Sequence, residues 1–325
     1  MERRQFIQSI MIGATAAHFS ATAQTGSWPD KPIKLILSQP AGSGADTMAR
    51  LISEQLSRKW GQSIVIDNRP GGQNVIGAQL AAKSAGDGYN FYFATAAALA
   101  TNPHLIKGLP YDPKKDFTAV GLVGKVPFLI CVNANSSLKT IQDLVAYAKA
   151  NPGALNVANE GPKTFSGMMT RLVSAQFGIQ LNAVSYVSIG AAVTDTVGGQ
   201  TEAIVTDMPS AMQMIKTGKL RPLAVTTAKR VAGLEAVPPL ADFLPGFDFA
   251  GWLAIVAPTG TPAAAIQRFN RDMDAVLLDK EIGARILAIG PITEGALSVQ
   301  QATAFLNAEY DRWTKVTKEI GILPE

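Results

Sequence analysis

The chain has 325 residues, of which 47% are hydrophobic, and it carries a formal net charge of +4 at pH 7. This length and apolar content are sufficient for two domains with buried cores. The small, evenly spread positive charge does not suit a nucleic-acid surface, so we expect no nucleic-acid partner. The single cysteine, Cys131, excludes an internal disulfide and lies in an apolar run typical of a buried, unreactive side chain.

Residues 1–23 have the pattern of a secretory signal peptide. The pair Arg3-Arg4 supplies a positive start, residues 6–20 are mostly apolar or small and carry no charge, and Ala21-Thr22-Ala23 has the small-x-small form of a cleavage site. The run is too short and too rich in small residues for a membrane span. We therefore expect a periplasmic protein whose mature chain begins near Gln24 with a net charge of +3. The arginine pair also fits twin-arginine export, and the sequence leaves the route open.

The mature chain begins with a strand, a glycine-containing loop and an amphipathic helix. The strand is expected at Ile33–Leu37 and the helix over Thr47–Trp60. Apolar residues recur at helical spacing in this helix: Met48, Leu51, Ile52, Leu56 and Trp60. Ser43 or Asp46 is expected to cap its start, and Gly61 is expected to end it.

Similar units follow along the rest of the chain. The further strands are predicted at Ile64–Ile66, Phe91–Ala94, Phe128–Val132, Leu155–Ala158, Ala183–Val187, Ala203–Val205, Pro222–Thr226 and Trp252–Ala257. Helices are predicted over Val75–Ser84, Ala263–Asp279 and Ser298–Ile320. Another helix begins at Thr140, where Asp143 three residues later completes a capping pattern.

Strands that alternate with helices predict an α/β fold with largely parallel sheets. In such sheets ligands bind beyond the carboxyl ends of the strands, where the connecting loops gather. The loops of interest are 38–44, 67–74, 95–98, 133–135, 159–165, 188–190 and 207–209. At this length, two sheets with a cleft between them are favoured over one sheet.

Patterns typical of several enzyme classes are missing from the sequence. After the signal peptide, His104 is the one histidine, and it lies far from Cys131, so neither a clustered metal site nor a Ser-His-Asp triad is expected. The sequence contains no phosphate-binding P-loop motif. We therefore expect a protein that is not an enzyme, with no catalytic residues, no metal and no cofactor, in which His104 is a structural or surface residue.

One motif has two interpretations. Gly42-Ser43-Gly44 follows a strand and opens a helix, as in dinucleotide-binding loops, although Thr47 takes the place of the third glycine. With Asp67 as its acidic partner, this loop would belong to a nucleotide-dependent enzyme, which is the alternative function. More generally, backbone N–H groups at a helix N-terminus bind small anions that glycine allows to approach closely. A carboxylate is then the expected ligand, and Asp46 is expected to cap the helix.

Short blocks along the chain resemble the Bug-type periplasmic receptors of tripartite tricarboxylate transporters. They include the opening Trp28–Ile33, the first loop Pro40–Asp46 and the second loop Asn68–Gly72. The remaining blocks are Gly86–Tyr89, Leu109–Pro113, Gly198–Gln200, Lys216–Leu220 and Ala257–Pro262. Each block is weak alone, but all of them in this order are specific.

The resemblance implies a type II periplasmic-binding-protein fold, in which two lobes joined by a hinge close on a ligand in the cleft between them. It places residues 24–125 and 224–325 in lobe 1 and residues 126–223 in lobe 2. Family ligands are small carboxylates held mainly by main-chain amides and waters. Carried over to this chain, the ligand-binding residues are Ala41, Gly42, Ser43, Gly44, Gly72, Asn74, Thr95 and Ala96 in lobe 1, and Asn133, Lys163, Thr164, Phe165, Ser188, Ile189, Asp207 and Met208 in lobe 2.

The chain departs from this family after the strand at 183–187. Family members commonly have a Tyr-Lys-Gly block there, and Tyr186–Gly190 lacks the lysine. With Phe165 and Met208 in neighbouring loops, this wall suits the spacer of terephthalate or adipate better than citrate; the alternative is that these side chains are lobe core. The expected partners are a small carboxylate and inner-membrane transporter subunits, and the receptor itself is expected to be a monomer.

Overall fold

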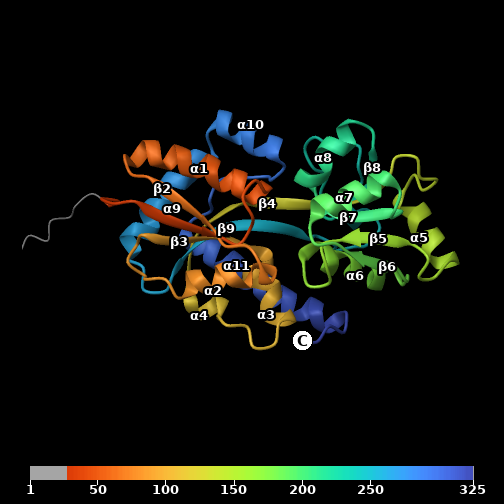
Figure 1. Ribbon diagram of the computed structural model, residues 1–325, viewed down its shortest axis with the longest axis horizontal. Coiled ribbons are helices and arrows are strands. Elements are labelled where there is room, and N and C mark those ends of the chain that lie inside the picture. Colours follow the sequence, from red (N-terminus) through yellow and green to blue (C-terminus); the bar gives the residue numbers. More distant parts are fainter. Residues whose placement is uncertain (1–27, 325) are drawn as a thin grey trace, which may run out of the picture.

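The computed structural model describes residues 28–324, which form two lobes that share long strands (Figure 1). The predicted signal peptide lies outside the described residues. The strands follow the order β2-β1-β3-β9-β4-β7-β5-β6, and β8 also pairs with β4. Because β4 (Phe117–Asn133) pairs with β9 in its first part and with β7 and β8 in its second part, it joins the two lobes.

Lobe 1 contains a parallel set of three strands. These are β1 (Ile33–Leu37), β2 (Ile64–Asn68) and β3 (Asn90–Thr95), and β9 (Ala250–Pro258) runs antiparallel to β3. The longer helices of this lobe are α1 (Gly44–Trp60), α2 (Val75–Ala82), α9 (Ala263–Leu277), α10 (Lys280–Ile289) and α11 (Val299–Glu319). Apolar side chains of β1 enter cores on both faces of the sheet, as expected of a covered parallel strand.

Lobe 2 repeats this plan with a second parallel set. β5 (Asn156–Asn159) lies between β6 (Asn182–Ser185) and β7 (Ala203–Asp207), while β8 (Leu220–Val225) runs antiparallel to β4. Its helices are α5 (Ile141–Ala150), α6 (Phe165–Phe177), α7 (Ile189–Gly198) and α8 (Met208–Lys216). The two-lobed α/β fold predicted from the sequence is therefore present.

Short helical segments connect these elements. They are η1 (Gly72–Asn74), η2 (Ala97–Thr101), α3 (Asn102–Leu105), α4 (Pro113–Asp116) and η3 (Leu240–Asp242). Among residues 28–324, no helix combines the length and the apolar character that crossing a membrane requires.

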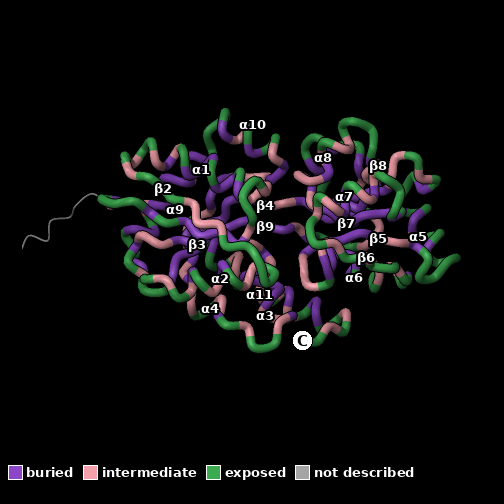
Figure 2. Tube along the Cα trace, viewed as in Figure 1, coloured by how far each residue is buried: buried purple, intermediate pink, exposed green. Residues whose placement is uncertain are grey.

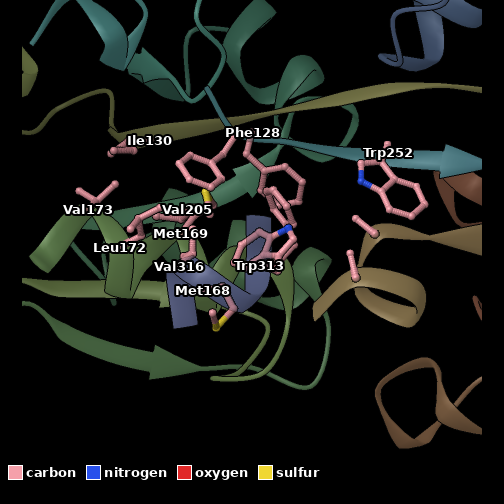
Figure 3. Packing of buried hydrophobic residues seen from close by; sticks show 14 of the residues in the cluster. Phe128, Ile130, Met168, Met169, Leu172, Val173, Val205, Trp252, Trp313 and Val316 are labelled. Atoms are coloured by element: carbon pink, nitrogen blue, oxygen red, sulfur yellow. The ribbon is translucent and has the colours of Figure 1, made fainter. Parts of the chain in front are cut away.

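An aromatic cluster connects the lobes beside the shared strands. Trp313 of α11 is fully buried, and its ring centroid lies 5.6 Å from that of Phe165 in α6 and 5.8 Å from that of Phe249. Phe165 also packs against Phe128 of β4, with centroids 4.6 Å apart. Figure 3 shows Trp313 and Phe128 among the methionine and valine side chains of the same core, and Figure 2 shows the buried strands that run through both lobes.

The packing of the segment after β8 bears on where lobe 2 ends, which the sequence placed at residue 223. β8 continues to Val225 within the sheet of lobe 2. Beyond it, Val231, Leu234 and Val237 are buried in the same cluster as residues of β7 and α8. We therefore propose that lobe 2 comprises residues 126–249, because the segment after β8 buries its apolar side chains against that lobe.

Candidate ligand-binding site

The carboxyl ends of the two parallel sets meet where the lobes touch. In lobe 1 the loops after β1 and β2 lie at this edge, and in lobe 2 the loops after β5, β6 and β7 do. Pro209, the second residue of α8, links the two edges: a Cβ atom at Gly44 would lie 3.7 Å from the Pro209 Cβ. A Cβ atom at Gly290, which ends α10, would lie 2.6 Å from the Pro209 Cγ. Glycine at position 290 therefore leaves room for Pro209, whereas a Cβ atom at position 44 would make only an ordinary contact with it.

Asp46 organises the loop after β1. Its carboxylate accepts hydrogen bonds from the Gly42 N–H (2.9 Å), the Arg50 Nε (2.9 Å) and the Asn68 Nδ2 (3.0 Å). Although burial opposes ionisation, the hydrogen bonds from Arg50, Gly42 and Asn68 and the charge of Arg50 lower the pKa of Asp46. Asp46 is thus a structural residue that joins the first two loops of lobe 1.

Ser43 is the N-cap of α1. Its hydroxyl oxygen accepts the Asp46 N–H at 3.2 Å, and Gly61 ends the helix as predicted. The expectation that Asp46 caps the helix is wrong, because Asp46 lies within its first turn. Because Asp46 holds the Gly42 N–H, the donors that remain for an anion at this helix start are the first-turn amides of Gly44 and Ala45, which have no intrahelical acceptor. Ala41 and Gly42 are exposed beside them.

The loop after β2 is held in an unusual conformation. Gly71, Gly72, Gln73 and Asn74 have successive positive φ angles of 116°, 55°, 54° and 77°. A left-handed conformation of a residue other than glycine costs about 1–3 kcal/mol and persists where neighbours enforce it. Here the Asn74 Oδ1 accepts a hydrogen bond from the Gln39 Nε2 at 2.6 Å, which ties this loop to the one after β1.

The remaining predicted residues of lobe 1 follow β3. Thr95 is partly buried, and its hydroxyl accepts the Ala98 N–H at 3.3 Å. Ala96 is buried, with 2% of its surface exposed, so its side chain offers little area for a ligand. The Asn102 Nδ2 donates to the Gln73 carbonyl at 2.8 Å, so this segment supports the loop after β2.

In lobe 2, three predicted residues already cap helix starts. Thr164 accepts the Gly167 N–H of α6 at 3.2 Å, Ser188 accepts the Ala191 N–H of α7 at 3.3 Å, and Asp207 accepts the Ser210 N–H of α8 at 2.8 Å. Lys163 lies partly buried in the loop before α6. As at the start of α1, each of these caps occupies only one amide of its helix.

Two residues of the predicted apolar wall belong to the core of lobe 2. Phe165 is 7% exposed and packs on Phe128 and Trp313, and Met208 is 2% exposed within the cluster around β7. Their burial favours the alternative that these side chains are lobe core, because the first residue of each helix turns inward. Ile189 is partly buried at the start of α7 and remains a candidate contact.

Asn133 lies at the opposite end of lobe 2 from the other predicted residues. β4 runs antiparallel to β7, so Phe128 pairs with Asp207 and the chain then moves away from that edge. The Asn133 Nδ2 donates to the carbonyls of Thr196 and Val197 at 3.1 and 2.8 Å, near the end of α7. Its prediction as a ligand contact assumed that every strand ends at the same edge, whereas β4 ends at the opposite edge from β7.

Glu160 was not predicted as a site residue, although it lies in the loop directly after β5. It is partly buried, and its carboxylate accepts a hydrogen bond from the Ile189 N–H. Burial and the charge of Asp207 raise the pKa of Glu160 to about 7, and burial also raises the pKa of Asp207. Its position immediately after a predicted strand was the signal available in the sequence.

The geometry gives no support to the dinucleotide interpretation. The Asp67 carboxylate forms ion pairs with the Arg69 Nε at 2.7 Å and with the Lys34 Nζ at 3.9 Å. The Gly42 N–H already donates a hydrogen bond to the Asp46 carboxylate. Within residues 28–324, no three His, Cys, Asp or Glu side chains cluster to form a metal site. A surface cavity of about 620 Å³ is separate from the loops after β1 and β2 and lies between α6 and the segment after α11.

Comparisons with known proteins identify the family. The model of the family described as "Tripartite tricarboxylate transporter family receptor" matches residues 48–322. The chain is 32% identical to Protein BugT of Bordetella pertussis, with 99% of each chain covered. Among solved structures, it is 33% identical to R. palustris Rpa4515 with adipate (TM-score 0.85, 92% of this chain and 100% of that chain). It is 25% identical to MatC of Rhodopseudomonas palustris with bound malate (TM-score 0.79, 89% and 99%). The chain belongs to the tripartite tricarboxylate transporter receptor family.

Proposed function

We propose that this chain is a monomeric periplasmic receptor, and not an enzyme, that captures a small carboxylate between its lobes and delivers it to inner-membrane transporter subunits. The observation that carries the proposal is the approach of the two sets of strand ends, where Pro209 of lobe 2 lies opposite Gly44 at the helix start of lobe 1, 3.7 Å from where a Cβ atom of residue 44 would be. A ligand held there would touch both lobes, and its binding would favour their contact.

The first carboxylate would bind to lobe 1. The amides of Gly44 and Ala45 point from the start of α1, where the helix dipole favours a negative charge. Ser43, Gly72 and Asn74 lie in the two loops that Asp46 and Gln39 hold together. Because hydrogen bonds fix these loops in advance, little ordering would be needed on binding.

The ligand that we favour is a dicarboxylate with an apolar spacer, such as adipate or terephthalate. Support comes from Rpa4515, which is 33% identical and was solved with adipate. At the start of α7, Ile189 and the fully exposed Val187 offer apolar surface to a spacer. Citrate would place further charge against this surface, and burying charge without a partner is costly.

Calorimetry on purified mature protein tests the proposal with adipate, terephthalate, benzoate, citrate, glutamate and nicotinate, and with NAD for the alternative function. We expect adipate or terephthalate to bind in the micromolar range or better, and citrate at least about tenfold more weakly, a difference of about 1.4 kcal/mol. Tightest binding of citrate or glutamate would contradict the ligand class and leave the receptor function standing. Binding of NAD without binding of any carboxylate would contradict both.

Export is tested separately. Protein recovered from the periplasm should begin near Gln24, as N-terminal sequencing would show, whereas an intact Met1 start would contradict signal-peptide cleavage. Replacement of Arg3 and Arg4 by lysine should block export only if the twin-arginine route is used.

A further inference from the structure

Asn102, in the segment after β3, supports the loop after β2. Its Nδ2 donates to the Gln73 carbonyl at 2.8 Å, although 29 residues separate the two in the chain. Asn102 is fully buried, whereas Gln73 is exposed. A carbonyl oxygen can only accept a hydrogen bond, so the amide nitrogen of Asn102, and not its oxygen, must face Gln73. The loop is therefore held by a buried donor that an apolar side chain could not replace.

An unusual helical turn brings Asn102 to this position. η2 is a π-helix, and the Asn102 N–H donates to the Ala97 carbonyl five residues earlier. Pro103 has no N–H to offer this turn, and the Ala98 carbonyl instead accepts the Tyr111 hydroxyl at 2.7 Å. A π turn holds more residues than an α turn, which rotates the residues after it by roughly 100°. The wide turn thus determines which side chain of this segment faces the loop after β2.

The other end of the Asn102 amide has no partner. Within residues 28–324, no group donates a hydrogen bond to the Asn102 Oδ1, and the same is true of the Gln39 Oε1. Gln39 is the residue whose Nε2 ties Asn74 of the same loop. A buried acceptor without a donor destabilises the folded state. Folding alone therefore does not account for an amide side chain at these two positions.

The loop needs support because its backbone is left-handed. Gln73 (φ 54°, ψ 48°) and Asn74 (φ 77°) are not glycines, and residues with a Cβ atom keep this conformation where neighbours enforce it. The Ser38 hydroxyl donates to the Asn74 carbonyl at 3.0 Å, as the Asn102 amide does to the carbonyl before it. Two successive carbonyls are thus held from within lobe 1. This fixes the backbone of Gly72 and Asn74, which flank Gln73 and belong to the proposed ligand site.

We infer that Asn102 is a positioning residue for ligand capture, which holds the loop after β2 in the conformation that lets Gly72 and Asn74 meet the ligand. Because Asn102 is fully buried, it acts through the loop and not by contact with the ligand. The inference rests on the proposed function, which assigns Gly72 and Asn74 to the carboxylate site. Without the hydrogen bond, the binding-competent loop would be one conformation among several, and the apparent affinity falls with the fraction of molecules that adopt it.

Calorimetry with adipate tests the inference, or with the tightest-binding carboxylate of the panel if adipate does not bind. Asn102→Leu removes the donor, and we expect it to weaken binding at least about tenfold. Thr101→Val is the matched control. Thr101 is the equally buried neighbour, and its hydroxyl donates within its own turn, to the Ala97 carbonyl at 3.3 Å. This control should bind with undiminished affinity, even if its melting temperature falls.

A rescue by glycine separates positioning from a general loss of structure. Glycine adopts the left-handed conformation without a steric penalty, and the Gln73 side chain is exposed, so its removal disturbs no core. Asn102→Leu should therefore cost clearly less affinity in a Gln73→Gly background than in the unmodified protein. Damage to the core of lobe 1 would cost the same in both backgrounds.

Thermal unfolding identifies the folded variants, and Asn102→Ala repeats the test if Asn102→Leu does not fold. Undiminished binding in the folded variant, an equal loss in Thr101→Val, or an equal loss in both backgrounds would overturn the inference and leave the receptor function standing. If no carboxylate binds the unmodified protein, the proposed function fails together with the inference.

Discussion

At the scale of single residues, Gly44 combines two constraints at one position. It supplies an amide at the start of α1, and the Pro209 Cβ lies 3.7 Å from where a Cβ atom at Gly44 would be. We expect Gly44→Val to weaken carboxylate binding by more than tenfold, or about 1.4 kcal/mol, because its methyl groups would enter the space between the lobes. Gly44→Ala is the matched control, since a single Cβ makes only an ordinary contact with Pro209 and should change affinity little. Calorimetry on both folded variants would decide, and undiminished affinity in Gly44→Val would remove this helix start from the site.

Gly167 supports the loop that carries Glu160. A Cβ atom at Gly167 would lie 1.9 Å from the Gly161 carbonyl oxygen, so the loop would have to move. We expect Gly167→Ala to lower the melting temperature and weaken ligand binding, because overpacking typically costs about 1–3 kcal/mol. In the control variant Gly198→Ala in α7, the added Cβ atom would have no neighbour within 4 Å. Its melting temperature should therefore equal or exceed that of the unmodified protein. Equal melting temperatures for Gly167→Ala and the unmodified protein would contradict the contact.

Residue roles were predictable from the sequence where they depend on near neighbours. Ser43 caps α1, and Asp143 completes a capping box with Thr140. Both interactions join residues only three positions apart, so the local sequence was enough to predict them. Phe165 and Met208 each follow a loop, and only tertiary packing shows that their side chains turn into the core. The pKa of Glu160 is raised by burial and by the charge of Asp207, which is 47 residues away in the chain, so both causes exist only in the folded chain.

At the scale of secondary-structure elements, α11 connects the lobes and begins with a capping box. Ser298 accepts the Gln301 N–H at 3.2 Å, and the Gln301 side chain accepts the Ser298 N–H at 3.0 Å. We expect Ser298→Ala to lower the free energy of unfolding by about 1 kcal/mol. Thr303→Ala, on the exposed surface of the same helix, should have an effect close to zero or slightly stabilising. Urea denaturation of both variants measures the difference, and equal effects would contradict a capping role for Ser298.

Strand β4 shows why some elements could not be predicted. The sequence indicated a strand at Phe128–Val132, whereas the strand begins at Phe117 and changes register near Gly121 and Gly124. Those glycines interrupt an apolar pattern, yet they allow close packing: a Cβ atom at Gly121 would lie 2.6 Å from Met273, and one at Gly124 would lie 2.8 Å from the Ile292 carbonyl. Helix α10 was likewise missed, because Asp279 ends one helix region and caps the next.

At the scale of the whole molecule, Glu160 should make stability depend on pH. Its pKa of about 7 in the folded protein exceeds its ordinary value of 4.5, so the folded state binds more protons between these values. This contribution to stability is fully present below pH 4.5 and is lost as pH rises to about 7. We expect Glu160→Gln to melt at a higher temperature than the unmodified protein at pH 8 and at a similar temperature at pH 4. Melting curves without ligand at both pH values measure the effect, and a constant difference between the proteins would contradict the raised pKa.

The burial of Cys131 allows motion between the two lobes to be measured with labels on introduced cysteines. It is the sole cysteine of the chain, it is fully buried in β4, and burial raises the pKa of its thiol. Because thiol reagents attack exposed thiolates, the native protein should remain unlabelled while folded. Two new cysteines, one on the outer surface of each lobe, could therefore carry a fluorescent donor and acceptor without first removing the natural one. Energy transfer between them would follow the distance between the lobes in single molecules when a candidate carboxylate is added.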